Sequence, residues 1–412
     1  MQRDVAAVLL HSIARVQSGR MSIARTAVPG FSTTEMLARL VAFDTVSRNS
    51  NLALIEFVRG WLDAHGVFYR VSANPDGTKA NLHAVIGPRE PGGIALSGHV
   101  DTVPVDGQSW SADPFALRSE AGRVYGRGTT DMKGFVASFL AAVPDLRARV
   151  LARPLHLFIT YDEETSMDGA RRLIIDLGES GLRPDMCIVG EPSLMQPVLA
   201  HKGRLAVRAR VRGRGGHSSQ PARGVNAVHA AAQAVAMIVQ EAQRRAVEGP
   251  FVEGFDPPHS TIHVGTFSGG TILNMIPEHT EFVMEWRNVP GDDPFAELDH
   301  LRDEVGRKIE PNMHRVDPST GFVFEATEWC PPMSLDAGHP LVDLVRGLTG
   351  ANATGRVSYG TEGGLYQEAG IATIVCGPGA IAQAHQPDEW IAEDQLAACD
   401  TFVRRIADRL SA

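Results

Sequence analysis

The chain lacks long apolar runs, paired cysteines and a surplus of basic charge. No apolar stretch in its 412 residues reaches the ~18–20 residues that a membrane-spanning helix needs. The net charge of −9 argues against a nucleic-acid-binding surface. The four cysteines have no C-x-x-C spacing and are interpreted as reduced thiols in a cytosolic protein: Cys187, Cys330, Cys376 and Cys399. Internal repeats and low-complexity segments are also missing.

The length and composition fit a soluble α/β protein. A prior of roughly 150 residues per domain suggests two or three domains, and 43% hydrophobic residues with 41 glycines indicate many tight turns. Residues 1–31 read as an N-terminal extension with several arginines and one acidic residue, Asp4. A weak transit peptide, a short amphipathic helix and a disordered extension remain open, and Met21 is an alternative start.

Outside residues 200–315 the chain alternates between strand-like and helix-like segments. This alternation predicts a mixed, largely parallel sheet with helices on both faces, formed by residues 32–199 and 316–412. Ligands of such sheets bind beyond the carboxyl ends of the strands. Short apolar runs predict strands at 92–98, 154–161, 185–190 and 371–377, and helical periodicity predicts helices at 33–44, 51–66, 133–149 and 164–178.

Residues 200–315 have a different pattern of apolar and polar residues. Alternating apolar and polar residues predict half-buried strands, and two longer amphipathic segments predict helices. The order strand–helix–strand–strand–helix resembles a small ferredoxin-like α+β domain inserted into the larger one. A sheet edge or face of this kind is available for pairing with another subunit. The segments are 204–215, 224–246, 260–270, 278–290 and 294–310.

A set of metal-ligand types follows the predicted strands and turns of the larger domain. Imidazole and carboxylate are ligands that Zn²⁺ accepts, and a bridging carboxylate can hold two ions ~3.5–4 Å apart. The ordered set therefore suggests a two-metal hydrolase. Its members are His99, Asp131, the adjacent Glu163 and Glu164, Glu191 and His385.

Each member of this set has an ordinary explanation when it stands alone. His99 and Asp101 could be two polar residues of a surface loop, Asp131 could cap the helix that follows it, and an acidic pair after a strand is usually exposed. Together they favour catalysis. Asp101 would orient His99, and one of the adjacent glutamates would hold metal while the other accepts a proton from water. Lys133 is interpreted as a solvated first-turn residue.

The motifs SGHVDTVP, GRGTTDMKG, DEETS, GEP and AHQPDE occur in this order from about residue 32 to the C-terminus. The chain thereby resembles the co-catalytic di-zinc amidohydrolases and exopeptidases, a family that includes acetylornithine deacetylase, succinyl-diaminopimelate desuccinylase, aminoacylases and glutamate carboxypeptidases. AHKGRL, GRGGHSSQPARGVNA and CGPG look most like the acetylornithine deacetylases. The run from Ser268 to Pro294 matches them poorly apart from Asn274 and Arg287.

The resemblance implies a role for each candidate. It implies a catalytic domain of zinc-exopeptidase type that holds two Zn²⁺ per chain, with Co²⁺ or Mn²⁺ as substitutes. It also implies that Glu163 is the general base, that Asp101 supports His99, and that a cis peptide follows Asp131. The implied metal ligands are His99 and Glu191 on one zinc, Glu164 and His385 on the other, and Asp131 between them.

The inserted domain is expected, by the same resemblance, to act as a lid and to form a homodimer. His217 resembles the histidine that reaches the neighbouring subunit's active site, and Asn274 and Arg287 resemble residues that bind the substrate carboxylate. Gly364, with Gly363, Gly377 and Gly379, is expected to shape the pocket. The alternative for His217 is a histidine in a turn, and the alternative for Arg287 is a structural ion pair. The alternative for the glycines is that they form turns.

The expected activity is hydrolysis of the amide bond of an N-acyl amino acid. The resemblance favours deacetylation of N2-acetyl-L-ornithine in arginine biosynthesis, in the cytoplasm. A desuccinylase, a broader aminoacylase and a metallo-carboxypeptidase or dipeptidase remain open within the family. A metal-binding protein without catalysis is the alternative from another class, and the intact Glu163 argues against it.

Overall fold

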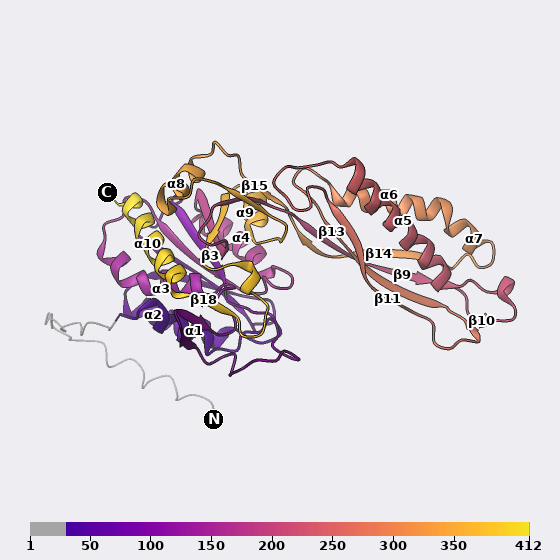
Figure 1. Ribbon diagram of the computed structural model, residues 1–412, viewed down its shortest axis with the longest axis horizontal. Coiled ribbons are helices and arrows are strands. Elements are labelled where there is room, and N and C mark those ends of the chain that lie inside the picture. The colour runs from indigo at the N-terminus through magenta and orange to yellow at the C-terminus, as the bar shows by residue number, and fades with distance from the viewer. Residues whose placement is uncertain (1–29, 412) are drawn as a thin grey trace, which may run out of the picture.

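A computed structural model describes residues 30–411, so the interpretations of the N-terminal extension before residue 30 lie outside the described residues. The described chain forms two lobes joined by long strands (Figure 1). We take the inserted part as residues 204–330 and the larger part as the rest. Among the described residues, no helix is long and apolar enough to cross a membrane.

The larger part is built on a nine-stranded sheet whose centre is parallel, as the sequence predicted. The strands β6, β3, β7 and β17 run parallel to one another, and antiparallel strands flank them. The order along the sheet is β1 (Phe68–Ala73), β2 (Ala80–Ile86), β6 (Leu155–Thr160), β3 (Ile94–His99), β7 (Met186–Pro192), β17 (Ala372–Gly377), β8 (Val198–His201) and β15 (Met333–Ser334), with β16 (Gly355–Val357) beside β8.

Helices cover both faces of this sheet because alternate strand residues point to opposite sides. On β3, Leu96 faces the first core and Ala95 faces the second. The first core includes α1 (Thr33–Val41), α2 (Leu52–Ala64), α3 (Lys133–Ala148), α8 (Pro340–Thr349) and α10 (Glu393–Leu410). The second includes α4 (Asp168–Ser180) and α9 (Gly363–Glu368). A small sheet lies beside them: β4 (Arg118–Glu120), β5 (Arg123–Tyr125) and β18 (Trp390–Ala392).

The inserted part has its own antiparallel sheet and its own apolar core. The sheet order is β11 (Thr261–Gly269), β13 (His279–Arg287), β9 (Arg204–Arg212) and β14 (Gly321–Cys330), with α5 (Ala227–Glu248) and α6 (Pro294–Lys308) packed on one face. The other face is polar. There, Arg210 pairs with Glu281 at 3.1 Å and with Glu325 at 3.0 Å.

The strand β14 changes the expected boundary between the two parts. The sequence assigned residues from 316 onward to the larger domain, but β14 pairs with β9 inside the inserted sheet. It completes the strand–helix–strand–strand–helix–strand order of a ferredoxin-like fold. The remaining short elements of the inserted part are β10 (Gly216–His217), β12 (Met275–Ile276), α7 (Glu310–His314) and a 3₁₀ turn at Pro221–Arg223; a second 3₁₀ turn, Ile381–Gln383, belongs to the larger part.

Candidate metal centre

Three parallel strands deliver side chains to one edge of the large sheet. His99 is the last residue of β3, Glu163 follows the end of β6 by three residues, and Glu191 is the second-last residue of β7. All three are buried. Because β3 lies between β6 and β7 and runs parallel to both, these segments, distant in sequence, meet at the same edge.

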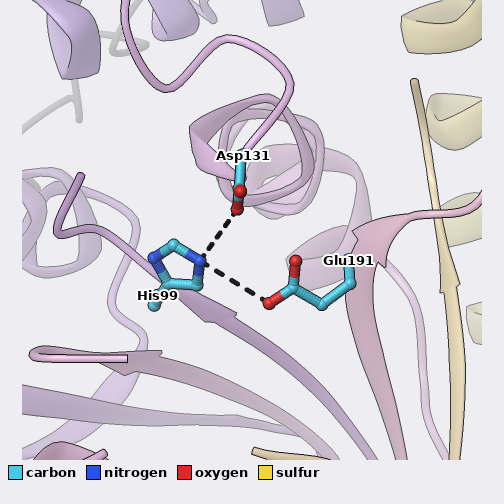
Figure 2. Close-up of side chains that lie close together, drawn as sticks. All are labelled: His99, Asp131 and Glu191. Carbon is cyan, nitrogen blue, oxygen red and sulfur yellow. Dashed lines mark hydrogen bonds and ion pairs between the residues drawn. The ribbon is translucent and has the colours of Figure 1, made fainter. Parts of the chain in front are cut away.

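The first ligand group consists of His99, Asp131 and Glu191, whose ligand atoms all lie within 4.8 Å of one another. His99 Nε2 is 3.0 Å from Asp131 Oδ1 and 3.6 Å from Glu191 Oε1 (Figure 2). An imidazole nitrogen and two carboxylate oxygens converging in this way fit one divalent cation.

The second ligand group consists of Asp131, Glu164 and His385, again with ligand atoms within 4.8 Å. His385 Nε2 lies 3.1 Å from Asp131 Oδ2 and 3.1 Å from Glu164 Oε2. Asp131 therefore turns one oxygen to each group, which is the arrangement a bridging carboxylate requires. The peptide between Asp131 and Met132 is cis, which confirms the prediction.

Glu163 stands outside both groups. Its Oε2 lies 3.9 Å from His99 Nε2, whereas the adjacent Glu164 faces His385. The neighbouring glutamates thus point to different places, and one is left free of the ligand groups. A carboxylate next to two cation positions can accept a proton from a water molecule held there.

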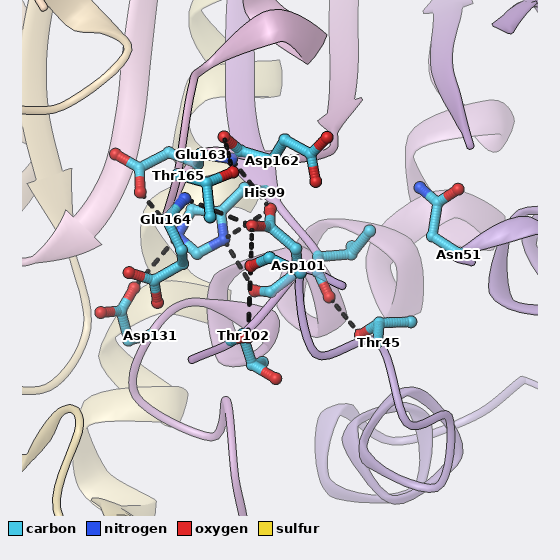
Figure 3. A network of polar contacts seen from close by, with 12 residues as sticks. Thr45, Asn51, His99, Asp101, Thr102, Asp131, Asp162, Glu163, Glu164 and Thr165 are labelled. Carbon is cyan, nitrogen blue, oxygen red and sulfur yellow. Dashed lines mark hydrogen bonds and ion pairs between the residues drawn. The ribbon is translucent and has the colours of Figure 1, made fainter. Parts of the chain in front are cut away.

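Asp101 links His99 to the loop that carries the two glutamates (Figure 3). His99 Nδ1 lies 3.0 Å from the backbone carbonyl of Asp101 and 3.5 Å from its carboxylate. A carbonyl only accepts, so Nδ1 carries the hydrogen and Nε2 keeps its lone pair for a metal. The Asp101 carboxylate accepts from the backbone N–H groups of Glu163, at 3.1 Å, and Glu164, at 3.2 Å.

The centre concentrates negative charge in a buried place. Burial and the charge of Glu191 raise the pKa of Glu163 well above its usual range. Burial and the charge of Asp131 raise the pKa of Glu164 to about 7. Hydrogen bonds to Asp131 and Glu164 raise the pKa of His385 to about 10. Five carboxylates crowded against two imidazoles are costly unless cations balance them, so the donor set fits divalent metal.

Two of the inserted-part candidates, His217 and Asn274, are not brought to this centre within one chain. His217 and Asn274 are exposed and lie together at the far end of the inserted part, where the Ser218 N–H donates to the Asn274 carbonyl at 3.1 Å (Figure 1). Arg287 lies at the opposite end of the sheet, where its Nε is 3.0 Å from Glu285 Oε1. Asn274 and Arg287 of one chain therefore cannot hold the same carboxylate.

Two other expectations need a different explanation. Lys133 is fully buried rather than solvated, because its Nζ donates to the Phe43 carbonyl at 3.0 Å, and burial lowers its pKa to about 7. Gly364 is buried against the backbone of Pro331, and a Cβ there would lie 2.0 Å from the Pro331 carbonyl oxygen. Close backbone packing explains this glycine.

An ion pair that was not predicted from the sequence lies next to Asp131. Arg127 and Glu389 pair at 2.7 Å, and each side chain is only 1% exposed. Both residues lie in motifs singled out above, Arg127 before TTD and Glu389 at the end of AHQPDE. Their position in those motifs could have indicated a functional role. No sequence pattern indicates that two residues so far apart in the chain form an ion pair.

The fold and the two ligand groups that share Asp131 fit a metal-dependent hydrolase. The family model described as "Peptidase family M20/M25/M40" matches residues 95–409. The chain therefore belongs to this family.

The relatives agree with this assignment. The chain is 36% identical over 381 residues to an acetylornithine deacetylase of Photorhabdus laumondii, an alignment covering 91% of this chain and 96% of the relative. It is 39% identical over 364 residues to an acetylornithine deacetylase of Klebsiella pneumoniae, covering 87% and 92%. A tripeptidase structure from Staphylococcus aureus shares the fold, with a TM-score of 0.72 and 18% identity over 92% of this chain and 97% of that one.

Proposed function

We propose that this chain removes the acetyl group of N2-acetyl-L-ornithine, giving L-ornithine and acetate for arginine biosynthesis in the cytoplasm. The observation that carries the proposal is the pair of ligand groups that share Asp131 and lie beside the free carboxylate of Glu163. The two acetylornithine deacetylases similar to this chain over most of its length support the choice of substrate.

The two ligand groups would hold two Zn²⁺ ions, for which Co²⁺ or Mn²⁺ could substitute. When bound, the ions would polarise the amide carbonyl and lower the pKa of water. His99 and Glu191 serve one position, Glu164 and His385 serve the other, and Asp131 serves both. The mixture of imidazole and carboxylate donors supports zinc.

Glu163 is the general base of the proposed reaction. It takes a proton from the attacking water as the new oxygen–carbon bond forms, and it delivers this proton to the α-nitrogen as the carbon–nitrogen bond breaks. Asp101 supports this role through its hydrogen bonds to the backbone of Glu163 and Glu164. The loop is thereby held against His99, so the proton acceptor stays beside the metal positions.

Substrate binding would use two subunits of a homodimer. Arg287 lies at the end of β13 beside the start of β9, near the junction with the larger part, and would bind the substrate α-carboxylate. His217 and Asn274 lie at the remote tip, so they would act in the centre of the partner subunit. This division would explain why the inserted part carries its candidate residues at opposite ends.

A substrate panel on purified, zinc-loaded protein tests the proposal. We expect N2-acetyl-L-ornithine to be hydrolysed with a higher kcat/KM than N-succinyl-diaminopimelate, other N-acetyl amino acids and dipeptides. Preference for a succinyl substrate or a dipeptide would move the assignment to another member of the family. Two bound metals without hydrolysis of any substrate would contradict the enzyme assignment.

A further inference from the structure

The Arg127–Glu389 ion pair lies next to Asp131 of the metal centre but belongs to neither ligand group. Burying both charges carries a desolvation cost that a pair of packed apolar side chains would avoid. The hydrogen bonds around the pair show what the charges hold in place.

Glu389 holds the turn that carries Asp131. Its Oε1 accepts from the backbone N–H of Thr130 at 2.9 Å and from that of Asp131 at 3.2 Å. The backbone carbonyl of Glu389 also accepts from the Gly126 N–H at 2.9 Å. A charged acceptor gives stronger hydrogen bonds than a neutral one, so Glu389 fixes the backbone position of the shared carboxylate.

Arg127 reaches the segment that carries His385. Its Nη2 donates to Gln108 Oε1 at 2.5 Å, and Gln108 Nε2 donates to the His385 backbone carbonyl at 2.9 Å. Its Nη1 also lies 3.4 Å from the Gln386 carbonyl. The guanidinium lies over the Trp110 ring at 5.0 Å. The planar fork of arginine suits these divergent partners, whereas the point charge of lysine does not.

We propose that Arg127, Glu389 and Gln108 are positioning residues that set the affinity of the second ligand group for metal. This inference rests on the proposed two-metal function. The network holds the backbones of Asp131 and His385, two of the three residues in that group. Among the described residues, no hydrogen bond or ion pair joins Arg127 or Glu389 to His99 or Glu191, so the first group depends on the network only through Asp131.

The test measures metal binding rather than activity alone. Metal-free protein is titrated with Zn²⁺ in a chelator-buffered calorimetric assay for the wild type, Gln108→Ala and Arg127→Lys. We expect one of the two ions to bind about 10–100-fold more weakly in each variant, the usual cost of losing an outer hydrogen bond at a metal site. The other ion should change by less than about threefold.

Matched controls separate positioning from general damage. Gln196→Ala removes an exposed glutamine, and Arg153→Lys alters an exposed arginine paired with Asp185 at 2.5 Å. Neither should change metal binding. Turnover lost by Gln108→Ala at low Zn²⁺ should return when Zn²⁺ is raised, with KM nearly unchanged.

The outcomes are distinct. Equal weakening of both ions, or wild-type affinities in Gln108→Ala and Arg127→Lys, would overturn the positioning role. If Arg127→Lys fails to fold, Gln108→Ala still decides, because Gln108 is only half-buried and donates directly to the His385 backbone carbonyl. A wild type that binds fewer than two ions would instead contradict the proposed function.

Discussion

The larger part and the inserted part place their polar candidates in opposite ways. In the larger part, parallel strands end at one edge, and ligands from residues 99 to 385 converge within a few ångströms. In the inserted part, His217 lies on β10 of a separate two-stranded sheet at the far end, whereas Arg287 ends β13 of the four-stranded sheet at the opposite end. Parallel topology assembles a site within one chain, whereas the inserted part spreads its candidate residues over its two ends.

Replacing Glu163, the proton acceptor in the larger part, should lower kcat more than any other substitution. Glu163→Gln keeps the shape of the side chain but cannot accept a proton, so we expect kcat to fall ~10²–10⁴-fold. Metal content, measured by elemental analysis, should stay near two per chain because Glu163 belongs to neither ligand group. The exposed Glu179→Gln serves as control. A near-normal kcat would shift the base assignment to Glu164.

Removing the remote histidine tests whether the inserted part acts across subunits. We expect His217→Ala to lose ~10²–10³-fold in kcat, the size of effect seen when one oxyanion donor is removed, while both metals stay bound. His229→Ala, on α5, should remain active.

Mixing the two inactive variants sharpens this test. A heterodimer of Glu163→Gln and His217→Ala can combine one intact Glu163 with an intact His217 of the partner subunit. Activity should therefore return in part as subunits exchange. No recovery despite exchange shown by mass spectrometry, or full activity of a monomer, would contradict the trans-acting role.

Substitution of Arg287, at the other end of the inserted part, should have a smaller effect on catalysis. Arg287→Lys keeps the charge but loses the fork that matches a carboxylate. We expect KM to rise about tenfold for substrates with a free α-carboxylate, since a hydrogen bond to a charged group is worth about 1.5–3 kcal/mol. Substrate amides should be affected little. Arg208→Lys, on the polar face of β9, is the control, and equal effects on acids and amides would assign Arg287 to structure.

The smallest effect concerns the stability of the larger part. Its sheet buries His83 against His156, with Nε2 and Nδ1 2.9 Å apart. Burial, and for His83 also the charge of His156, lowers the pKa of His83 to about 3, and burial lowers that of His156 to about 4. Unfolding frees both to take up protons near pH 6.5, so stability is full above that pH and falls as pH drops toward 4.

Denaturant unfolding of metal-free protein between pH 7 and pH 4 measures this loss. The wild type should lose up to about 1.4 kcal/mol per pH unit for each histidine, relative to the double variant His83→Leu/His156→Gln. The exposed His300→Gln should keep the wild-type slope. Parallel slopes for the wild type and the double variant would show that other groups cause the pH dependence.

Much of the fold follows from local patterns in the sequence. Apolar runs predicted β3, β6, β7 and β17, and their parallel order predicted that residues at their ends would meet. Residues 321–330, which form β14, were grouped with the larger domain, and no strand was predicted for them. The register of β14 shifts between Ala326 and Glu328, which breaks the two-residue alternation of a half-buried strand.

Contacts between distant segments could not be predicted. A lysine at the start of a helix, such as Lys133, is usually exposed to solvent. Its burial depends on the Phe43 carbonyl, which accepts from its ammonium group only in the folded chain. Likewise, Arg127 and Glu389 are separated by 262 residues. The candidate ligands were recognisable because their residue types are unusual together, whereas such supporting residues are ordinary until their partners are known.

The chain passes between the two parts twice, and the two connecting segments lie side by side in both parts. Arg204, at the start of β9, lies opposite Cys330, at the end of β14, and β8 lies beside β15 just across the junction. The inserted part, more than a hundred residues long, therefore begins and ends on two neighbouring strands. Such close ends let one domain be spliced into another without rearranging the host. A short loop from residue 203 to residue 331 would leave every pairing of the large sheet in place.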